Sequence, residues 1–386
     1  MKIRFNREQL LNAINIASKA VSSKTTMPIL ECFLITAFGD DIRITSNDTE
    51  LGIETLIHTA SAEEEEKKNG CMVIEPGRTA LEARLFSDII RKITAESDSD
   101  IFLEQTGSVV RITCNSSEYR IQERDPDQFP ALPMIREDRY ITVSQFTLRE
   151  VIRQTLFSVA VNDSNKMMTG ELFEVDHDVL KAVSLDGHRI SIRNTELRDD
   201  YGTLKAIIPG KTLNEISKIL NGESDSEVQI FFDSNHIMFR FDDTLMVSRL
   251  IDGKYFRIDS MLSTDYETKV TVNKRDFLDN IERSIVLVRE TDKKPLVLTI
   301  TDGCMNLKMN TIVGRLNSDL FINKTGKDIM IGLNPKFLLD ALRVIDDEQI
   351  TLYMTNSKAP CFIRDDEQKY IYLILPINFN PAAYDA

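Results

Sequence analysis

The segment "YITVSQFTLREVIRQTLFSVAV", Tyr140–Val161, places a short alternating stretch directly before a run with apolar residues at helical spacing. Alternation of apolar and polar residues is typical of a half-buried strand, and apolar residues three and four positions apart are typical of an amphipathic helix. The segment therefore predicts a strand followed by a helix over Gln145–Val161. The same order recurs near both ends of the chain, where "MKIRF" precedes a predicted helix over Arg7–Val21 and "KVTVN" precedes one over Lys274–Val288.

A second set of helices is predicted from three segments that resemble one another, "EPGRTALEA", "IPGKTLNEI" and "LNPKFLLDA". Each has a proline at or beside its expected first turn, at Pro76, Pro209 and Pro335. Proline is tolerated there because it loses no helical hydrogen bond and its φ is already suitable. The three prolines lie 133 and 126 residues apart. This period indicates three domains of similar size.

Alternating segments follow each of these predicted helices: "IFLEQTGSVVRIT", "VQIFFDSNHIMFRF" and "ITLYMTNSKAPCFI". Each is interrupted by turn-forming residues, with Gly107, Asn235 and Pro360 near the tips, so we expect β-hairpins. The pattern predicts an α+β fold of three repeated domains, each with two helices packed on antiparallel sheets. The expected boundaries are 1–128, 129–253 and 254–386.

Composition excludes several classes of protein. No run of about eighteen apolar residues occurs in the 386, so no membrane-spanning helix and no membrane partner are expected. The five cysteines are widely spaced, odd in number and without a CxxC pair, which argues against a disulfide framework or a zinc site. We expect a cytoplasmic protein without cofactors. The net charge of −14 would ordinarily disfavour binding to nucleic acid.

Charge is nevertheless segregated by element. The six predicted helical segments contain fifteen basic and ten acidic residues, a net charge of +5, which leaves −19 for the remainder of the chain. Mixed charge on solvated helix faces is common and is one interpretation. The other is that all six helices face one polyanion while the sheets carry the negative charge away from it, so the overall acidity does not exclude DNA.

The segment "SLDGHRIS", Ser184–Ser191, contains an acid, a base and a cation side by side. Catalysis by Asp186 and His188 would need a positioned nucleophile, metal or cofactor. The sequence has no P-loop, GxGxxG or GxSxG motif, and its four histidines lack metal-ligand spacing. Asp-Gly is also a common hairpin turn, here between "LKAVSL" and "RISIRN". A turn is therefore favoured over an active site, and no catalytic residues are assigned.

Over nearly its full length the sequence resembles the family of bacterial DNA polymerase sliding clamps, the beta subunits of DNA polymerase III. The resemblance rests on the opening "MKIRFNREQLLNAINIASKAVSSKTTMPILECFLI", on "LFEVDHDVLKAVSLDGHRIS", on "LIDGKYFRID" and on the terminal "YLILPINF". It implies three domains of one fold in a head-to-tail homodimer that forms a closed ring. The implied function is a non-enzymatic processivity factor that encircles duplex DNA and tethers the replicative polymerase.

The resemblance also implies a surface pocket that receives short hydrophobic peptides. The implied partners are the alpha subunit of the replicative polymerase, the clamp loader, other DNA polymerases and repair proteins. Two positions depart from the family pattern: no proline follows the aromatic in "GKYFRID", near Phe256, and Asn165 stands where an arginine can occur. Carried over by position, the pocket residues are Met168, Leu185, Gly187, His188, Arg189, Phe256, Met261, Asn334, Phe337, Pro360, Leu373, Leu375, Pro376 and Ile377.

Contacts with DNA are expected to be to phosphates only, because a sliding protein must avoid base-specific bonds. The matching loop positions are Lys24, Asn162, Lys166 and Met167. Cations predicted to line the hole are Arg7, Arg78, Arg84, Arg149, Arg153, Lys211, Lys218, Lys274 and Lys336. Val286 and Leu287 match a patch at the dimer interface of the family. Two alternatives stay open at this point, an enzyme that uses Asp186 and His188 and a scaffold that binds peptides but not DNA.

Overall fold

The computed structural model describes residues 1–22, 24–39, 41–60, 70–93, 100–223, 225–288 and 294–384. The chain divides into two compact units. The first comprises Met1–Phe146 and Lys218–Leu250, and the second Thr147–Ser217 and Ile251–Ala386. All pairs of named strands are antiparallel, as the α+β prediction requires. No helix among the described residues is long and apolar enough to cross a membrane.

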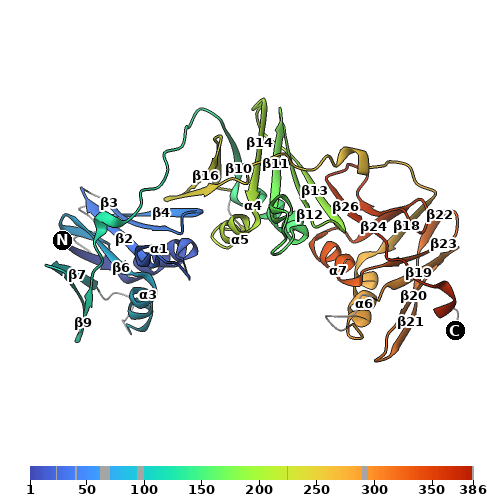
Figure 1. The fold of residues 1–386 in the computed structure, drawn as a ribbon, viewed down its shortest axis with the longest axis horizontal. Helices are drawn as coiled ribbons and strands as arrows, with labels where there is room; N and C mark the ends of the chain where they lie inside the picture. Colours follow the sequence, from blue (N-terminus) through green and yellow to red (C-terminus); the bar gives the residue numbers. More distant parts are fainter. Residues whose placement is uncertain are drawn as a thin grey trace. The chain divides into compact units, whose positions relative to one another are not determined.

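The described part of the first unit contains two sheets and two helices that pack side by side (Figure 1). The helices are α1 (Arg7–Ala17) and α3 (Ala83–Lys92). A five-stranded sheet has the order β5 (Met72–Glu75), β1 (Lys2–Asn6), β7 (Asp100–Thr106), β8 (Val109–Cys114) and β9 (Ser117–Gln122). An eight-stranded sheet has the order β10 (Tyr140–Ser144), β15 (Glu227–Phe232), β16 (His236–Phe241), β17 (Thr244–Arg249), β4 (Leu51–His58), β3 (Asp41–Asn47), β2 (Cys32–Phe38) and β6 (Gly77–Glu82).

The second unit also contains two sheets. A nine-stranded sheet has the order β14 (Thr203–Pro209), β11 (Gly170–Asp176), β12 (Val179–Leu185), β13 (Arg189–Glu196), β26 (Tyr370–Ile374), β25 (Cys361–Arg364), β24 (Gln349–Met354), β18 (Thr268–Asn273) and β22 (Asn323–Gly326). A four-stranded sheet has the order β21 (Arg315–Phe321), β20 (Cys304–Asn310), β19 (Leu296–Thr301) and β23 (Ile329–Leu333). The helices are α5 (Gly210–Ser217), α6 (Lys274–Ile285), α7 (Pro335–Val344) and most of α4 (Gln145–Thr155). Helices α6 and α7 pack together.

The predicted first helices begin where the sequence placed them but end sooner. Asparagine side chains cap three helix N-termini: Asn6 at α1, Asn273 at α6 and Asn334 at α7 each accept a hydrogen bond from the first turn. Helices α1 and α4 end at Ala17 and Thr155, and a tighter 3₁₀ turn follows each one. The expected continuations to Val21 and Val161 are therefore wrong.

The second helix of the first repeat was also placed too early. Pro76 precedes strand β6, which pairs with β2, and α3 begins only at Ala83. The chain stays extended there because β6 pairs with β2 over its full length, from Gly77 opposite Ala37 to Glu82 opposite Cys32. The observed helices repeat more evenly than the prolines do, since Ala83 to Gly210 is 127 residues and Gly210 to Pro335 is 125.

Charge segregation persists when the observed helices replace the predicted ones. The six α-helices among the described residues together contain twelve basic and eight acidic residues, a net charge of +4. Since the chain carries −14, the remainder carries −18. Arg78 is no longer part of this set, because it lies on β6, where it donates to Asp127 at 2.7 Å.

Two strand pairings connect segments from different expected repeats. Strand β17 pairs with β4, with Thr244 opposite Thr55, and β13 pairs with β26, with Ile190 opposite Leu373. The strands of the middle repeat therefore continue sheets that begin in its neighbours. This sharing explains why the boundary between the two compact units passes through the middle repeat.

Candidate functional site

The "SLDGHRIS" segment is a β-hairpin turn. It connects β12, ending at Leu185, to β13, beginning at Arg189, and Gly187 adopts φ = 82°, which glycine accepts without steric cost. The Asp186 carboxylate accepts hydrogen bonds from the backbone N–H groups of His188 and Arg189, at 3.0 and 3.1 Å. Asp186 therefore holds the turn together. The hairpin predicted from the sequence is confirmed.

Arg189 ties this hairpin to two other elements. Its guanidinium donates to the Asp186 carboxylate at 2.9 Å, to the Asp340 carboxylate of α7 at 2.6 Å and to the Phe157 carbonyl oxygen at 2.6 Å. It also lies over the Phe337 ring, 4.4 Å from the centroid. Only 11% of its side chain is exposed. Arg189 thus fixes the hairpin against α7 and the chain that follows α4.

His188 remains on the surface beside the same aromatic ring. Its imidazole lies nearly parallel to Phe337, with centroids 6.3 Å apart and an interplanar angle of 23°. Its carbonyl oxygen accepts a hydrogen bond from the Leu375 N–H at 2.9 Å. Leu375 is 39% exposed and is followed by the half-buried Pro376 and Ile377. Exposed and half-buried apolar and aromatic groups from three segments therefore meet around His188.

A second apolar group lies behind the hairpin. Leu185 and Leu373 are buried in one hydrophobic cluster, and the partly buried Met168 and Phe256 pack against it. The methyl of Met168 lies 3.8 Å from the position that a Cβ on Gly187 would occupy. Since Ile190 pairs with Leu373, this cluster is continuous with the surface around His188.

The remaining predicted pocket residues are placed differently. Asn334 caps the helix that carries Phe337, so its amide oxygen is already occupied by the Lys336 N–H at 3.0 Å. Pro360 directly precedes β25, whose Cys361 lies opposite Ile374. Met261 is exposed at the end of a short 3₁₀ turn, Asp259–Met261. Most of the predicted set therefore lies around one hairpin, and the Met261 side chain is 51% exposed.

Sequence reasoning missed a buried acid beneath this surface. The carboxylate of Glu171, on β11, accepts hydrogen bonds from the hydroxyls of Thr155 at 2.6 Å and Ser184 at 2.9 Å. Glu171 is fully buried, and desolvation raises the pKa of its carboxyl to about 8. The available signal was the placement of hydroxyl side chains at otherwise apolar positions, including Ser158 and Ser191, which hydrogen-bond at 2.6 Å.

The predicted DNA-contacting residues fall into two groups. Some already make hydrogen bonds or ion pairs within the protein. Arg153 donates to Glu150 and, at 2.8 Å, to Asp346, and Lys274 donates to the Ile345 carbonyl oxygen at 2.6 Å. Arg7 is partly buried against the Arg91 carbonyl oxygen, at 3.4 Å. Others are exposed and make no ion pair with any described residue, namely Lys24, Arg84, Arg149, Lys166 and Lys336.

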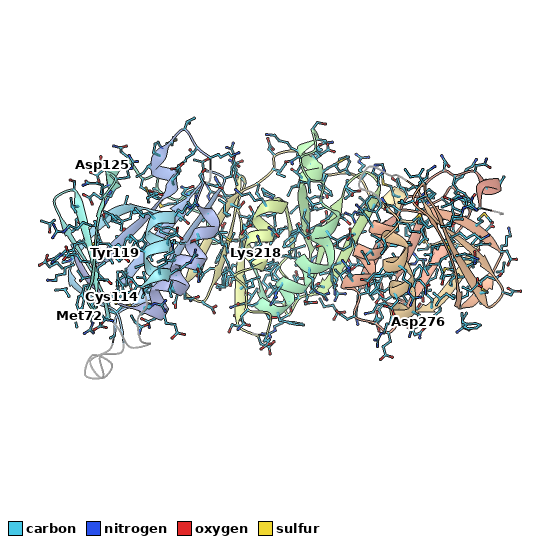
Figure 2. The ribbon with its side chains drawn as sticks, turned by 90° about the horizontal axis from the view of Figure 1, so that it is seen from below. Met72, Cys114, Tyr119, Asp125, Lys218 and Asp276 are labelled. Carbon is cyan, nitrogen blue, oxygen red and sulfur yellow. The ribbon has the colours of Figure 1, made fainter. Side chains whose placement is uncertain are left out.

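Four further positions of the DNA set have distinct surroundings. Lys218, labelled in Figure 2, lines a groove of about 560 Å³ together with Asn12 and Lys19 of the first unit. Asn162 is exposed with φ = 58°, in the left-handed region that asparagine tolerates. Met167 packs against the apolar cluster behind the hairpin instead of extending into solvent. Lys211, on α5, is exposed but already takes part in an interaction within the protein.

The two candidate interface residues differ in burial. Val286 is 84% exposed, whereas Leu287 packs against the core of its own unit and approaches Gly314. Within the described part of the chain, no group of three or more histidine, cysteine or carboxylate side chains is placed to hold a metal ion. The five cysteines are free thiols.

This arrangement is that of a repeat-built protein in which apolar and aromatic groups gather around the turn that contains Asp186 and His188. Family models match three consecutive parts of the chain. The N-terminal, central and C-terminal domains of the DNA polymerase III beta subunit match residues 1–133, 142–256 and 259–378. The chain therefore belongs to the DNA polymerase III beta subunit family, the beta sliding clamps. It is a processivity factor of DNA replication and not an enzyme.

Individual relatives match over almost the whole chain. The beta sliding clamp of Halalkalibacterium halodurans is 31% identical, over 98% of this chain and 99% of the relative. A crystal structure of a DNA polymerase III beta subunit from Eubacterium rectale is 51% identical and superposes with a TM-score of 0.92, over 98% of this chain and 100% of the other. The sliding clamp of Bacillus subtilis, at 29% identity, superposes with a TM-score of 0.93 over the same shares of the two chains.

Proposed function

We propose that two copies of this chain form a head-to-tail ring around duplex DNA in the cytoplasm. The observation that carries the proposal is the segregation of charge, +4 on the six α-helices that the structure describes against −18 in the rest of the sequence. Exposed cations such as Arg84, Arg149 and Lys336 attract phosphates without reading bases, which suits a protein that slides. In this proposal the segments 1–128, 129–253 and 254–386 are the three domains of each protomer.

Open sheet edges support the head-to-tail assembly. Strand β9 is an edge of the five-stranded sheet and carries Tyr119, labelled in Figure 2. Strand β21 is an edge of the four-stranded sheet and ends at Phe321, which is 91% exposed. Together with Val286, these groups place apolar side chains beside unpaired strand edges. Pairing β9 of one protomer with β21 of its partner would satisfy both edges and cover this surface.

The surface around His188 is proposed to receive a short apolar segment of partner proteins. Its aromatic and aliphatic groups, Phe337, Leu375 and Ile377, can act as anchoring contacts, and interface energy concentrates in such anchors. The partners in this proposal are the replicative polymerase alpha subunit, the clamp loader, and other polymerases and repair proteins that carry such a segment. His188 supplies the adjacent exposed polar group that can orient the segment.

Topological retention tests the proposal. The purified protein, assembled on circular duplex DNA by a clamp loader, should remain bound at high salt and be released when the circle is cut. A protein held only by charge would leave both circular and linear DNA as salt rises. Equal retention on the two forms would count against a ring.

A further inference from the structure

A groove of about 550 Å³ lies in the second unit beside the candidate peptide site. Two segments that carry predicted peptide-site residues also line this groove. Ile377 belongs to both, and the loop between β24 and β25 lines the groove up to Lys358, two residues before Pro360. A chain bound at the candidate site could therefore continue into the groove without leaving the surface of this unit.

The groove contains the outer edge of β23, which the chain itself covers in part. The Ile377 N–H donates to the Gly332 carbonyl oxygen of β23 at 2.8 Å, on the side of β23 that faces away from its partner β19. In an antiparallel sheet, residues two apart present their backbone groups to the same side. Met330 lines the groove and precedes Gly332 by two residues, so its N–H and C=O point into the groove. An extended segment can pair with this edge by strand addition.

The side chains around this edge are apolar at the base. Ile329, Met330, Ile377 and Phe379 line the groove and are only half buried. They provide contact area for alternate side chains of an added strand, which is how strand addition acquires specificity.

The rim carries one cation without an ion-pair partner among the described residues. Lys327 pairs with Glu267 at 2.7 Å, and Asp328 pairs with Lys324, which also pairs with Asp302 at 2.8 Å. Lys358 is exposed and makes no ion pair with any described residue. Its loop is ordered by Asn356, whose amide oxygen accepts from the Lys358 N–H at 2.9 Å. The groove therefore favours an acidic side chain near Lys358.

We propose that this groove binds the residues that flank the apolar anchors of a partner segment, as a short added strand along Met330 with an acidic side chain at Lys358. The inference rests on the proposed peptide site and extends it. The occupant is the same partner chain, so the groove would add affinity and select among partners by the charge of the flank.

Labelled peptides test the inference with the full-length protein. The core peptide carries a glutamine followed by leucine and phenylalanine, and two longer peptides extend it at one end or the other by five residues that include two glutamates. One extended peptide should bind roughly fivefold more tightly than the core, an effect of the size of one exposed ion pair. Lysines in place of the glutamates should abolish the gain.

A charge exchange provides the control. Lys358→Glu should remove the gain for the acidic flank and confer it on the lysine flank, while the core peptide binds as before. Lys369→Glu, at an exposed lysine outside the groove, should leave all affinities unchanged. If the core peptide binds but neither flank increases its affinity, or if the increase survives Lys358→Glu, the proposed role of the groove is wrong while the peptide site stands. Failure of every peptide to bind overturns the peptide site and the groove together.

Discussion

Arg189 donates a hydrogen bond to the Asp340 carboxylate at 2.6 Å, across 151 residues of sequence. The same guanidinium donates to Asp186 and to the Phe157 carbonyl oxygen. Arginine has five N–H donors, so at least three are used within the protein. Arg189 therefore holds a hairpin turn, a helix and the segment after α4 in one arrangement around the candidate peptide site.

Replacing Arg189 with alanine should destabilise the protein and weaken peptide binding together. The change removes the donor to the Asp186 and Asp340 carboxylates, whose side chains are 15% and 36% exposed, and to the Phe157 carbonyl oxygen. We therefore expect a loss of roughly 1–3 kcal/mol, below the cost of breaking a fully buried pair. Chemical denaturation and peptide titration measure the two effects. Arg240→Ala, at an arginine that pairs with Glu137 on the surface of the first unit, serves as the control and should change neither by much. Normal stability in Arg189→Ala would contradict the structural role.

Alanine substitutions at Leu375 and Leu373 should have different effects, the first on peptide affinity and the second on folding stability. Leu375 is 39% exposed and Leu373 is 3% exposed, although they lie two residues apart. Leu375→Ala should weaken the core peptide by roughly 1–3 kcal/mol if the peptide buries this side chain, with little loss of stability. Leu373→Ala should cost about 2–5 kcal/mol of folding free energy because it opens a cavity in the apolar cluster. Equal peptide affinity in wild type and Leu375→Ala would remove this residue from the site.

Much of the secondary structure could be predicted from the sequence because each signal is local. Strand alternation located β1, β10, β18 and the three hairpins, and "LDG" located the turn before Arg189. The start of α3 could not be predicted in this way. Proline at Pro76 and the likeness of "EPGRTALEA" to the other repeats suggested a helix, but β6 is stabilised by pairing with β2, a strand distant in sequence.

The candidate site was predictable as a set of positions but not as a set of interactions. Nothing local in the sequence indicates that Arg189 meets Asp340, that Arg153 meets Asp346, or that Glu171 is buried, since each depends on segments brought together by the fold. The structure was therefore needed to distinguish the cations that pair within the protein from those that are exposed without an ion pair.

Glu171 should make stability depend on pH. Its folded pKa, about 8, lies above its ordinary value of 4.5 because burial disfavours the carboxylate. The folded state thus retains a proton that the unfolded state releases, so the free energy of unfolding should fall as pH rises from about 4.5 to about 8. Glu171→Gln should remove this part of the pH dependence. Denaturation at pH 5.5 and pH 8 tests it, with the exposed Glu196→Gln as the control. Parallel pH profiles for wild type and Glu171→Gln would contradict a protonated Glu171.

Val286→Asp should dissociate the proposed dimer into folded protomers. The side chain is 84% exposed, so an aspartate there costs the protomer little but would place a charge in an apolar interface. Leu287 is a poorer site for this test because it packs against its own core. Sedimentation gives the native mass, and circular dichroism reports whether the protomer is folded. Asp279→Asn, on α6, which ends just before Val286, provides a surface control. A dimer that persists in Val286→Asp would place the interface elsewhere.

Binding to DNA should depend on the exposed helix cations and not on the cations that already pair with carboxylates of the protein. Arg84, Arg149 and Lys336 make no ion pair with any described residue, whereas Arg153 pairs with Glu150 and Asp346. Replacing the three exposed cations with alanine should weaken binding equally for unrelated duplexes. It should also make the slope of log affinity against log salt shallower, by about 0.9 for each phosphate that the variant no longer neutralises. Arg153→Ala should leave the slope nearly unchanged, because its charge is already compensated within the protein. A salt titration of the wild type, the triple variant and Arg153→Ala decides the matter. An unchanged slope in the triple variant, or a strong preference of the wild type for one sequence, would show that these helices are ordinary solvated surfaces.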